Sequence, residues 1–224
     1  MGGYTGSIRE VDEVLQGEWL PVFQRYSPCT ALQEPTWEAF AQRFGQHVPN
    51  AIPMCDAAVL APGDLRDTLL KMCTRTSLGA GSWSVHELRL WPDALLLKLC
   101  ECFQLIERTG KWPAALCLGL VTPLHKEEDR PLTADNTRPI TVMPVIYRLW
   151  AATRMRELIL WQENWLSTCV ASYRPNMGCE DIWMAEAMKV EHALLVGQPI
   201  AGVGLDFSKA FDNLPHEVLL SLAR

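Results

Sequence analysis

One carboxylate in this chain stands where a divalent cation could bind. Asp206 ends an apolar segment with period-two alternation, which predicts a strand over residues 200–207. The side chains on the face that we expect to be buried are Ala201, Val203, Leu205 and Phe207. The opposite face carries Gly202, Gly204 and Asp206, so that a substrate or a second backbone can approach the acid closely. An equally simple interpretation is that Asp206 caps a turn and that Asn213 and Pro215 begin the next helix.

Three segments, in order along the chain, resemble one protein family. Leu205-Asp206-Phe207-Ser208-Lys209-Ala210-Phe211-Asp212, followed by Pro215-His216, resembles motif A of the reverse transcriptases of LINE-type (non-LTR) retrotransposons. Residues 110–152, with Val121-Thr122-Pro123-Leu124-His125-Lys126 and Thr137-Arg138-Pro139-Ile140, are similar to the fingers motifs of that family. Residues 171–181, which contain Tyr173-Arg174-Pro175, are similar to its aromatic-Arg-Pro-x-x-Gly segment. The resemblance covers residues 79–224.

This resemblance implies a nucleotidyltransferase site around motif A. In the family, two Mg²⁺ ions, or Mn²⁺ in their place, activate the primer hydroxyl and stabilise the leaving pyrophosphate. Asp206 would be the catalytic carboxylate and a metal ligand, and the carbonyl of Phe207 would also touch the metal. Lys209 and Ala210 would offer backbone N–H groups to the triphosphate. Phe211 would stack under the sugar and exclude a 2′-hydroxyl, although ordinary core packing would also account for this ring.

Lys126 and Arg138 flank a polar loop between two strand candidates, residues 116–124 and 137–142. If these strands pair as a hairpin, both cations lie near the same end, where Lys supplies a point charge and Arg a planar fork for a triphosphate. The alternative is that the two cations only balance the acidic residues 127–129 on the surface. The family resemblance favours the nucleotide-binding role.

The net charge of −6 is unusual for a protein that binds nucleic acid. The charges are unevenly distributed, however, because residues 138–156 hold four arginines and no acid. Arg148, Arg154 and Arg156 are therefore candidates for weak template binding alongside Arg138. A solvated helix face would show the same pattern.

Composition is that of an intracellular globular chain, in the nucleus or cytoplasm and not secreted. Of the 224 residues 49% are hydrophobic, no apolar run is long enough to span a membrane, and the first residues lack a signal-peptide pattern. Eight cysteines show no C-x-x-C pair or zinc-finger spacing, which indicates reduced thiols.

Local patterns predict an α+β fold. They comprise helices with Ile8 and Trp19 on one face and around Phe40, a capping box at Ser84–Glu87, and a helix over 93–108 that ends at Gly110. Further helices are expected over 144–166 and 181–196. The predicted apolar stripe of the helix at 93–108 is Leu95, Leu99, Cys102 and Ile106, and that of the helix at 181–196 is Trp183, Ala187, Val190 and Leu194.

By the resemblance, this fold is the fingers and first palm strand of a right-hand polymerase, preceded by a mainly helical region. We expect a helical extension or linker at 1–78, a fingers-like region at 79–198 and the start of the palm at 199–224. The partners implied are an RNA template, a DNA primer and deoxynucleoside triphosphates, without a membrane.

The family's remaining catalytic carboxylates belong to an Ala-Asp-Asp type motif that these residues do not contain. We therefore expect a fragment of an RNA-directed DNA polymerase, truncated after motif A, in which two-metal catalysis belongs to the full-length parent and this chain is inactive. One alternative is a non-catalytic remnant that binds RNA through the arginines. Another is a protein-interaction module built on the N-terminal helices.

Overall fold

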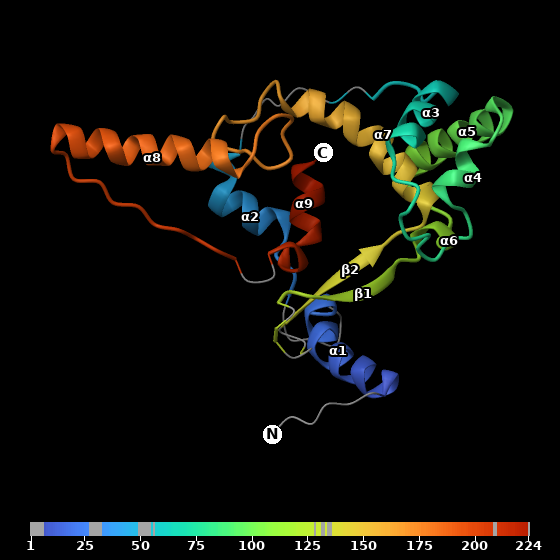
Figure 1. Ribbon diagram of the computed structural model, residues 1–224, viewed down its shortest axis with the longest axis horizontal. Coiled ribbons are helices and arrows are strands. Elements are labelled where there is room, and N and C mark those ends of the chain that lie inside the picture. The colour runs from blue at the N-terminus through green and yellow to red at the C-terminus, as the bar shows by residue number, and fades with distance from the viewer. Residues whose placement is uncertain are drawn as a thin grey trace. The chain divides into compact units, whose positions relative to one another are not determined.

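The structure is a computed structural model that describes residues 7–26, 33–48, 55, 57–127, 129–130, 133, 136–207 and 210–223. These residues form helices and one two-stranded sheet, which is an α+β composition (Figure 1). They divide into two compact units. The first unit takes its residues from 1–52, 125–137 and 201–224, and the second from 53–124 and 138–200.

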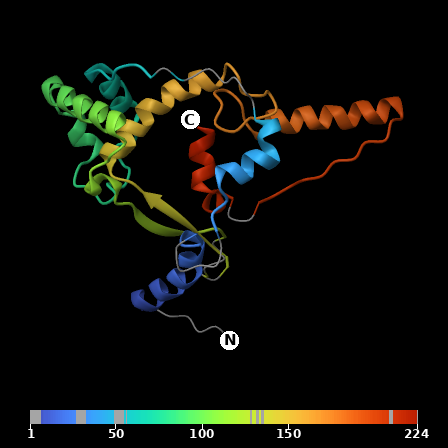
Figure 2. The same cartoon turned by 180° about the vertical axis from the view of Figure 1, so that it is seen from behind.

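The core of the second unit is built around helix α3, Pro62–Lys71, which packs against α4, Val85–Arg89, α5, Asp93–Thr109, and α7, Val145–Gln162. Figure 2 shows the same group of helices from behind. The buried side chains that form this core are Leu60, Leu65, Leu69, Val85, Leu88, Leu96, Cys100, Phe103, Ile106, Val145 and Leu149. The core therefore uses residues on both sides of position 79, where the family resemblance begins.

Helix α5 begins and ends where the sequence predicts, and its C-terminal Gly110 has the left-handed conformation with φ of 64°. Its predicted buried stripe is wrong at Leu95 and Cys102, which are exposed. The buried stripe is instead Leu96, Cys100, Phe103 and Ile106. Two neighbouring stripes of this helix are apolar at helical spacing, and the one that carries the larger Phe103 ring faces the core.

The loop before α4 approaches the beginning of α7 closely. A Cβ added to Gly79 would lie 2.7 Å from the carbonyl oxygen of Met143, and Gly79 has a φ of 69°. Arg148 of α7 donates through Nη1 to the hydroxyl of Thr76, at 2.7 Å, and through Nη2 to the carbonyl of Ser77. The predicted capping box is confirmed, because Ser84 Oγ accepts from the Glu87 amide and the Glu87 carboxylate accepts from the Ser84 amide.

The predicted pairing of the two strands is confirmed, but the first strand begins at Leu120 and not at residue 116, because residues 114–117 form a helical turn. Strand β1, Leu120–His125, pairs with β2, Thr137–Val142, and follows the short helix α6, Ala114–Cys117 (Figure 1). At the open end, Gly119 lies so close to Thr141 that an added Cβ would be 2.5 Å from its methyl group. Gly119 thus allows the segment before β1 to lie close to the end of β2, where β2 leads into α7.

Helix α8, Cys179–Val196, ends at Gly197 in the left-handed conformation, as predicted. Among the described residues no element covers its predicted apolar face, and Trp183 and Leu194 are exposed. Only Ala193 of this helix is buried.

The first unit contains the predicted helices α1, Ile8–Phe23, and α2, Trp37–Phe44, followed by the 3₁₀ turn η1, Gly45–His47. Its C-terminal part contains the 3₁₀ turn η2, Phe211–Asn213, and helix α9, His216–Leu222. Helix α1 packs against η2, and α2 packs against α9. Trp19 of α1 and Val218 of α9 are buried in this unit.

Candidate functional site

Asp206 lies in an extended segment, not in the strand that its sequence predicts. Residues 201–207 form no ladder, and the only sheet among the described residues pairs β1 with β2. Val203, Leu205 and Phe207, which we expected in a core, are 86%, 81% and 74% exposed. The prediction is wrong because a strand requires a partner for its backbone N–H and C=O groups, and no other described segment supplies one.

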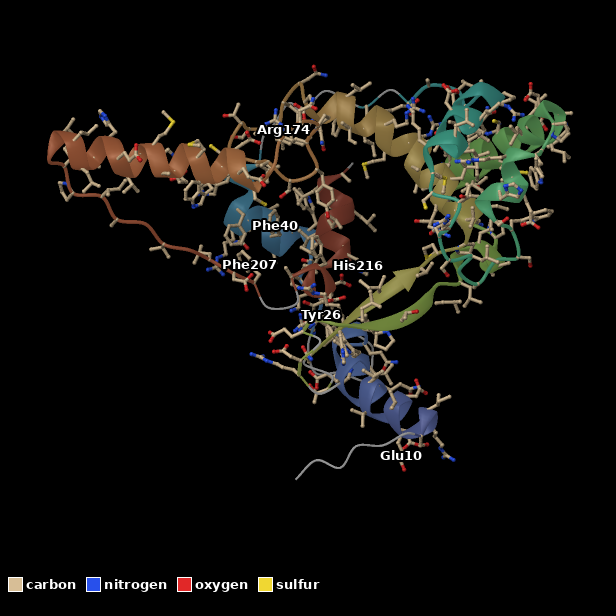
Figure 3. The ribbon with its side chains drawn as sticks, in the orientation of Figure 1. Glu10, Tyr26, Phe40, Arg174, Phe207 and His216 are labelled. Carbon is tan, nitrogen blue, oxygen red and sulfur yellow. The ribbon has the colours of Figure 1, made fainter. Side chains whose placement is uncertain are left out.

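The glycine face of this segment is open, as expected. A Cβ added to Gly202 or Gly204 would meet no atom within 4 Å. Asp206 and Phe207 are exposed at the end of the segment, where Figure 3 labels Phe207. The acid therefore stands in solvent and is accessible to a ligand from several directions.

The turn after Asp206 carries the residues expected to contact a nucleotide. Lys209 lies outside the described residues. Ala210 is exposed, and Phe211, the first residue of η2, is 77% exposed. Ordinary core packing, the alternative considered for this ring, is therefore not its role in this structure.

The end of η2 is held by the N-terminal part of the same unit. Arg25, which follows α1, donates through Nη1 to the Asn213 side-chain oxygen. An open cavity of about 300 Å³ lies beside this bond and is lined by residues 22–26, Glu34, Asp212, Leu214 and His216. Figure 3 labels Tyr26 and His216, two of the residues that line the cavity.

The hairpin brings Lys126 and Arg138 to the same end of the sheet, since β1 ends at His125 and β2 begins at Thr137. Both residues are exposed. The buried side chain of Asn136 organises the loop between them. Its amide nitrogen donates to the Glu127 carbonyl at 3.0 Å, its oxygen accepts from the Glu127 amide at 3.2 Å, and its carbonyl accepts from the Lys126 amide at 2.9 Å.

Arg154 does not belong to an exposed basic strip. Its side chain is 10% exposed and forms a bidentate pair with Glu107, in which Nε and Nη2 each lie 2.7 Å from a carboxylate oxygen. Nη1 donates to Glu157 and to the Ala58 carbonyl, also at 2.7 Å. These hydrogen bonds raise the pKa of Arg154 and lower that of Glu107. The guanidinium is therefore committed to the fold and is unable to reach a template phosphate.

The other two arginines of α7 differ from Arg154. Arg148 is partly buried, burial lowers its pKa, and two of its nitrogens bind the loop at Thr76 and Ser77. Arg156 is exposed and makes one long contact of 3.4 Å with the Thr68 hydroxyl. Of the three predicted template contacts on this helix, Arg156 is the most accessible.

The segment around Arg174 is a loop closed on the end of α7 (Figure 3). Nε and Nη2 of Arg174 bind the Glu163 carboxylate at 3.0 and 2.7 Å, and this pairing lowers the pKa of Glu163. Gln162 donates to the carbonyl of Tyr173, which has a φ of 59°. The conformation of this motif is therefore set by α7.

Three residues with structural roles, Asn136, Glu107 and Arg25, were not predicted from the sequence. The role of Asn136 could have been predicted from its type and place, because Asn in a loop often forms hydrogen bonds from its side chain to the backbone of that loop. Glu107 and Arg25 carry no local signal, since their partners lie 47 and 188 residues away.

A metal site would need more ligands than Asp206 supplies. Among the described residues there is no group of three or more His, Cys, Asp or Glu side chains that could hold a metal ion. These residues therefore do not fit a two-metal centre by themselves. Nor does any described helix have the length and apolar character to cross a membrane.

One curated protein is similar to the whole chain. The RNA-directed DNA polymerase from the mobile element jockey of Drosophila funebris is 22% identical over 225 residues, which cover 100% of this chain and 24% of that polymerase. The chain thus spans about a quarter of its relative's length. No protein-family model matches the chain. The similarity indicates a distant relationship to reverse transcriptases.

Proposed function

We propose that this chain is a segment of an RNA-directed DNA polymerase of the LINE type and that it contributes fingers and motif A of the polymerase domain. The observation that carries the proposal is the exposed Asp206 within a segment similar to motif A, in a chain whose whole length aligns with a retrotransposon polymerase. The order of the three motifs supports it, since ordered matches arise by chance far less often than single ones.

In this proposal Asp206 and the carbonyl of Phe207 bind a divalent cation, and Lys126 and Arg138 bind the triphosphate. The exposed positions of these four residues support these roles. Magnesium would neutralise the developing charge on the phosphates when bound. Because the described residues do not complete a two-metal centre, Asp206 is assigned one ligand position, and further ligands would have to come from elsewhere in the polymerase.

Lys209 and Ala210 would bind the triphosphate through backbone N–H groups, and Phe211 would select deoxynucleotides. The exposure of Ala210 and Phe211 supports contact with a ligand rather than with the core. A ring at the sugar position opposes a 2′-hydroxyl by its bulk, so this selectivity requires no specific hydrogen bond.

The alternative of an RNA-binding remnant rests on the arginines of α7. Arg154 is committed to Glu107 and Glu157, and Arg148 to the loop at 76–77, which leaves Arg156 as the accessible cation of that helix. Phosphate binding that depends on several cations is therefore less well supported than nucleotide binding.

The proposal is tested with protein purified from its native source through an antibody against these 224 residues. We expect incorporation of labelled deoxynucleotides on a primed RNA template, and loss of incorporation when a tagged gene copy carries Asp206→Asn. Salt-dependent binding of primed RNA without any incorporation would contradict the polymerase assignment and support the RNA-binding alternative.

A further inference from the structure

We propose that α1 and α2, together with Arg25 after α1 and Glu34 before α2, form a brace for the turn at residues 210–214, with Arg25 as its positioning residue. The proposal rests on the proposed function for what the turn does, namely presenting Phe211 and the Ala210 backbone to a nucleotide. The contacts that form the brace all lie within the first unit.

The first contact joins Arg25 to the last residue of η2. Arg25 Nη1 donates to Asn213 Oδ1, and the Arg25 guanidinium carbon lies 5.6 Å from the centre of the Tyr26 ring. Arg25 is itself tied to the end of α1, because its amide donates to the Val22 carbonyl at 3.4 Å. The donor is thus oriented by the helix before it and by the aromatic ring beside it.

The second contact joins the beginnings of α2 and α9. The Glu217 amide donates to the Glu34 carboxylate at 3.1 Å, and the Trp37 amide donates to the Glu217 carboxylate at 3.3 Å. The first amides of a helix have no partner within the helix. The first amide of α2 is therefore satisfied by a carboxylate of α9, and an early amide of α9 by the carboxylate of Glu34 in the segment before α2. These two bonds hold the beginning of α9 against the beginning of α2.

Apolar packing between the two contacts is incomplete. The end of α1, Leu214 and His216 all line the cavity of about 300 Å³. Val218 is buried one turn further along α9. Helix α1 packs against η2 but leaves the cavity open beside it, so that the position of the turn depends in part on the polar contacts on either side.

The turn itself is short and weakly bonded. The Asn213 amide donates to the Ala210 carbonyl at 3.3 Å, and the Leu214 amide donates to the Phe211 carbonyl at 3.4 Å. Holding Asn213 from Arg25 therefore limits how far Ala210 and Phe211 can move. Without that bond the turn would open more often, and the Phe211 ring would occupy a wider range of positions.

Hydrogen–deuterium exchange of the 224-residue chain tests the brace directly. In Arg25→Met we expect the amides of Asn213 and Leu214 to exchange about tenfold faster, since a hydrogen bond from a charged donor is lost, while amides in α5 are unchanged. Asn213→Ala, which removes the acceptor, should have the same effect. Arg9→Met is the matched control, because Arg9 lies on α1 and, within the described part of the chain, pairs only with Glu13 in the exposed contact at 3.0 Å.

Unchanged exchange of the turn in both Arg25→Met and Asn213→Ala would overturn the brace. If Arg25→Met also increases exchange in α5, the chain has unfolded globally and the Asn213→Ala result decides.

A second readout separates positioning from mere stability. The affinities for a fluorescent deoxynucleotide and the matching ribonucleotide are compared in the same chain. We expect their ratio to fall severalfold in Arg25→Met and to recover in Arg25→Lys, which keeps a donor. Equal affinities in the unaltered chain would contradict the role given to Phe211 under the proposed function, and the exchange measurement would still decide the brace.

Discussion

Replacing Arg154 with Met should destabilise the second unit rather than weaken RNA binding. The change removes four hydrogen bonds of 2.7 Å, two to Glu107, one to Glu157 and one to the Ala58 carbonyl. Breaking a fully buried pair costs about 3–5 kcal/mol. Because both carboxylates remain partly exposed and regain water, we expect a loss of about 2–3 kcal/mol.

The assay is urea unfolding followed by far-UV circular dichroism. With a slope of about 2 kcal/mol per molar urea, the midpoint should fall by about 1–1.5 M. Arg156→Met is the matched control. Arg156 lies two residues further along α7, and its exposed side chain makes a single long contact to the described residues, 3.4 Å from the Thr68 hydroxyl. Its free energy of unfolding should change by less than about 0.5 kcal/mol.

The ion pair between Arg154 and Glu107 also predicts that the stability of the second unit depends on pH. Hydrogen bonding from Arg154 lowers the pKa of Glu107 below its ordinary value of 4.5. A carboxylate whose pKa is lower in the folded protein than in the unfolded chain stabilises the fold. This stabilisation is complete above the pKa of the unfolded chain and is lost as pH falls through the pKa of the folded protein. Stability should therefore decrease below about pH 4.5, less steeply in Arg154→Met than in the unaltered chain. Equal stability of Arg154→Met and Arg156→Met, with weaker RNA binding only in Arg154→Met, would refute this reasoning.

Three further predictions concern single side chains. Gly79→Ala should lower the free energy of unfolding by about 1–3 kcal/mol, because the new Cβ would lie 2.7 Å from the Met143 carbonyl oxygen. Thermal melting measures this loss, and the control is Gly63→Ala, whose Cβ would meet no atom within 4 Å. Arg138→Ala should weaken deoxynucleotide binding by about 1.5–3 kcal/mol. Unchanged deoxynucleotide binding together with a lower affinity for RNA would contradict the nucleotide-binding role. Phe211→Ala should reduce discrimination against ribonucleotides in competitive binding without abolishing binding, and an unchanged ratio would show that the ring is not the selective group.

Local sequence signals predicted several elements of this chain, but not α3, around which the core of the second unit is built. The capping box at Ser84, the end of α5 at Gly110 and the pairing of β1 with β2 all depend on residues within a few positions or on one connecting loop. The segment before Asp206 shows the limit, because alternation marks a chain able to form a strand but does not supply its partner.

The chemistry of single charged residues was harder to predict. Arg154 and Arg156 are two residues apart with similar local surroundings, yet Arg154 is buried and Arg156 is exposed. The difference comes from Glu107, which reaches Arg154 from another helix. The same holds for Arg25 and Asn213, whose contact forms between distant parts of the chain. Such pairs are set by tertiary packing, which periodicity does not encode.

The most direct test of the central claim locates a divalent cation with its nucleotide on the chain. Mn²⁺ and a deoxynucleoside triphosphate are added to the isotopically labelled protein, and paramagnetic broadening of the amide resonances is mapped. We predict that broadening is centred on Asp206, Phe207 and Phe211 and is lost in Asp206→Asn. Broadening centred on the acidic loop at Glu127 and Asp129, unchanged by Asp206→Asn, would contradict the claim.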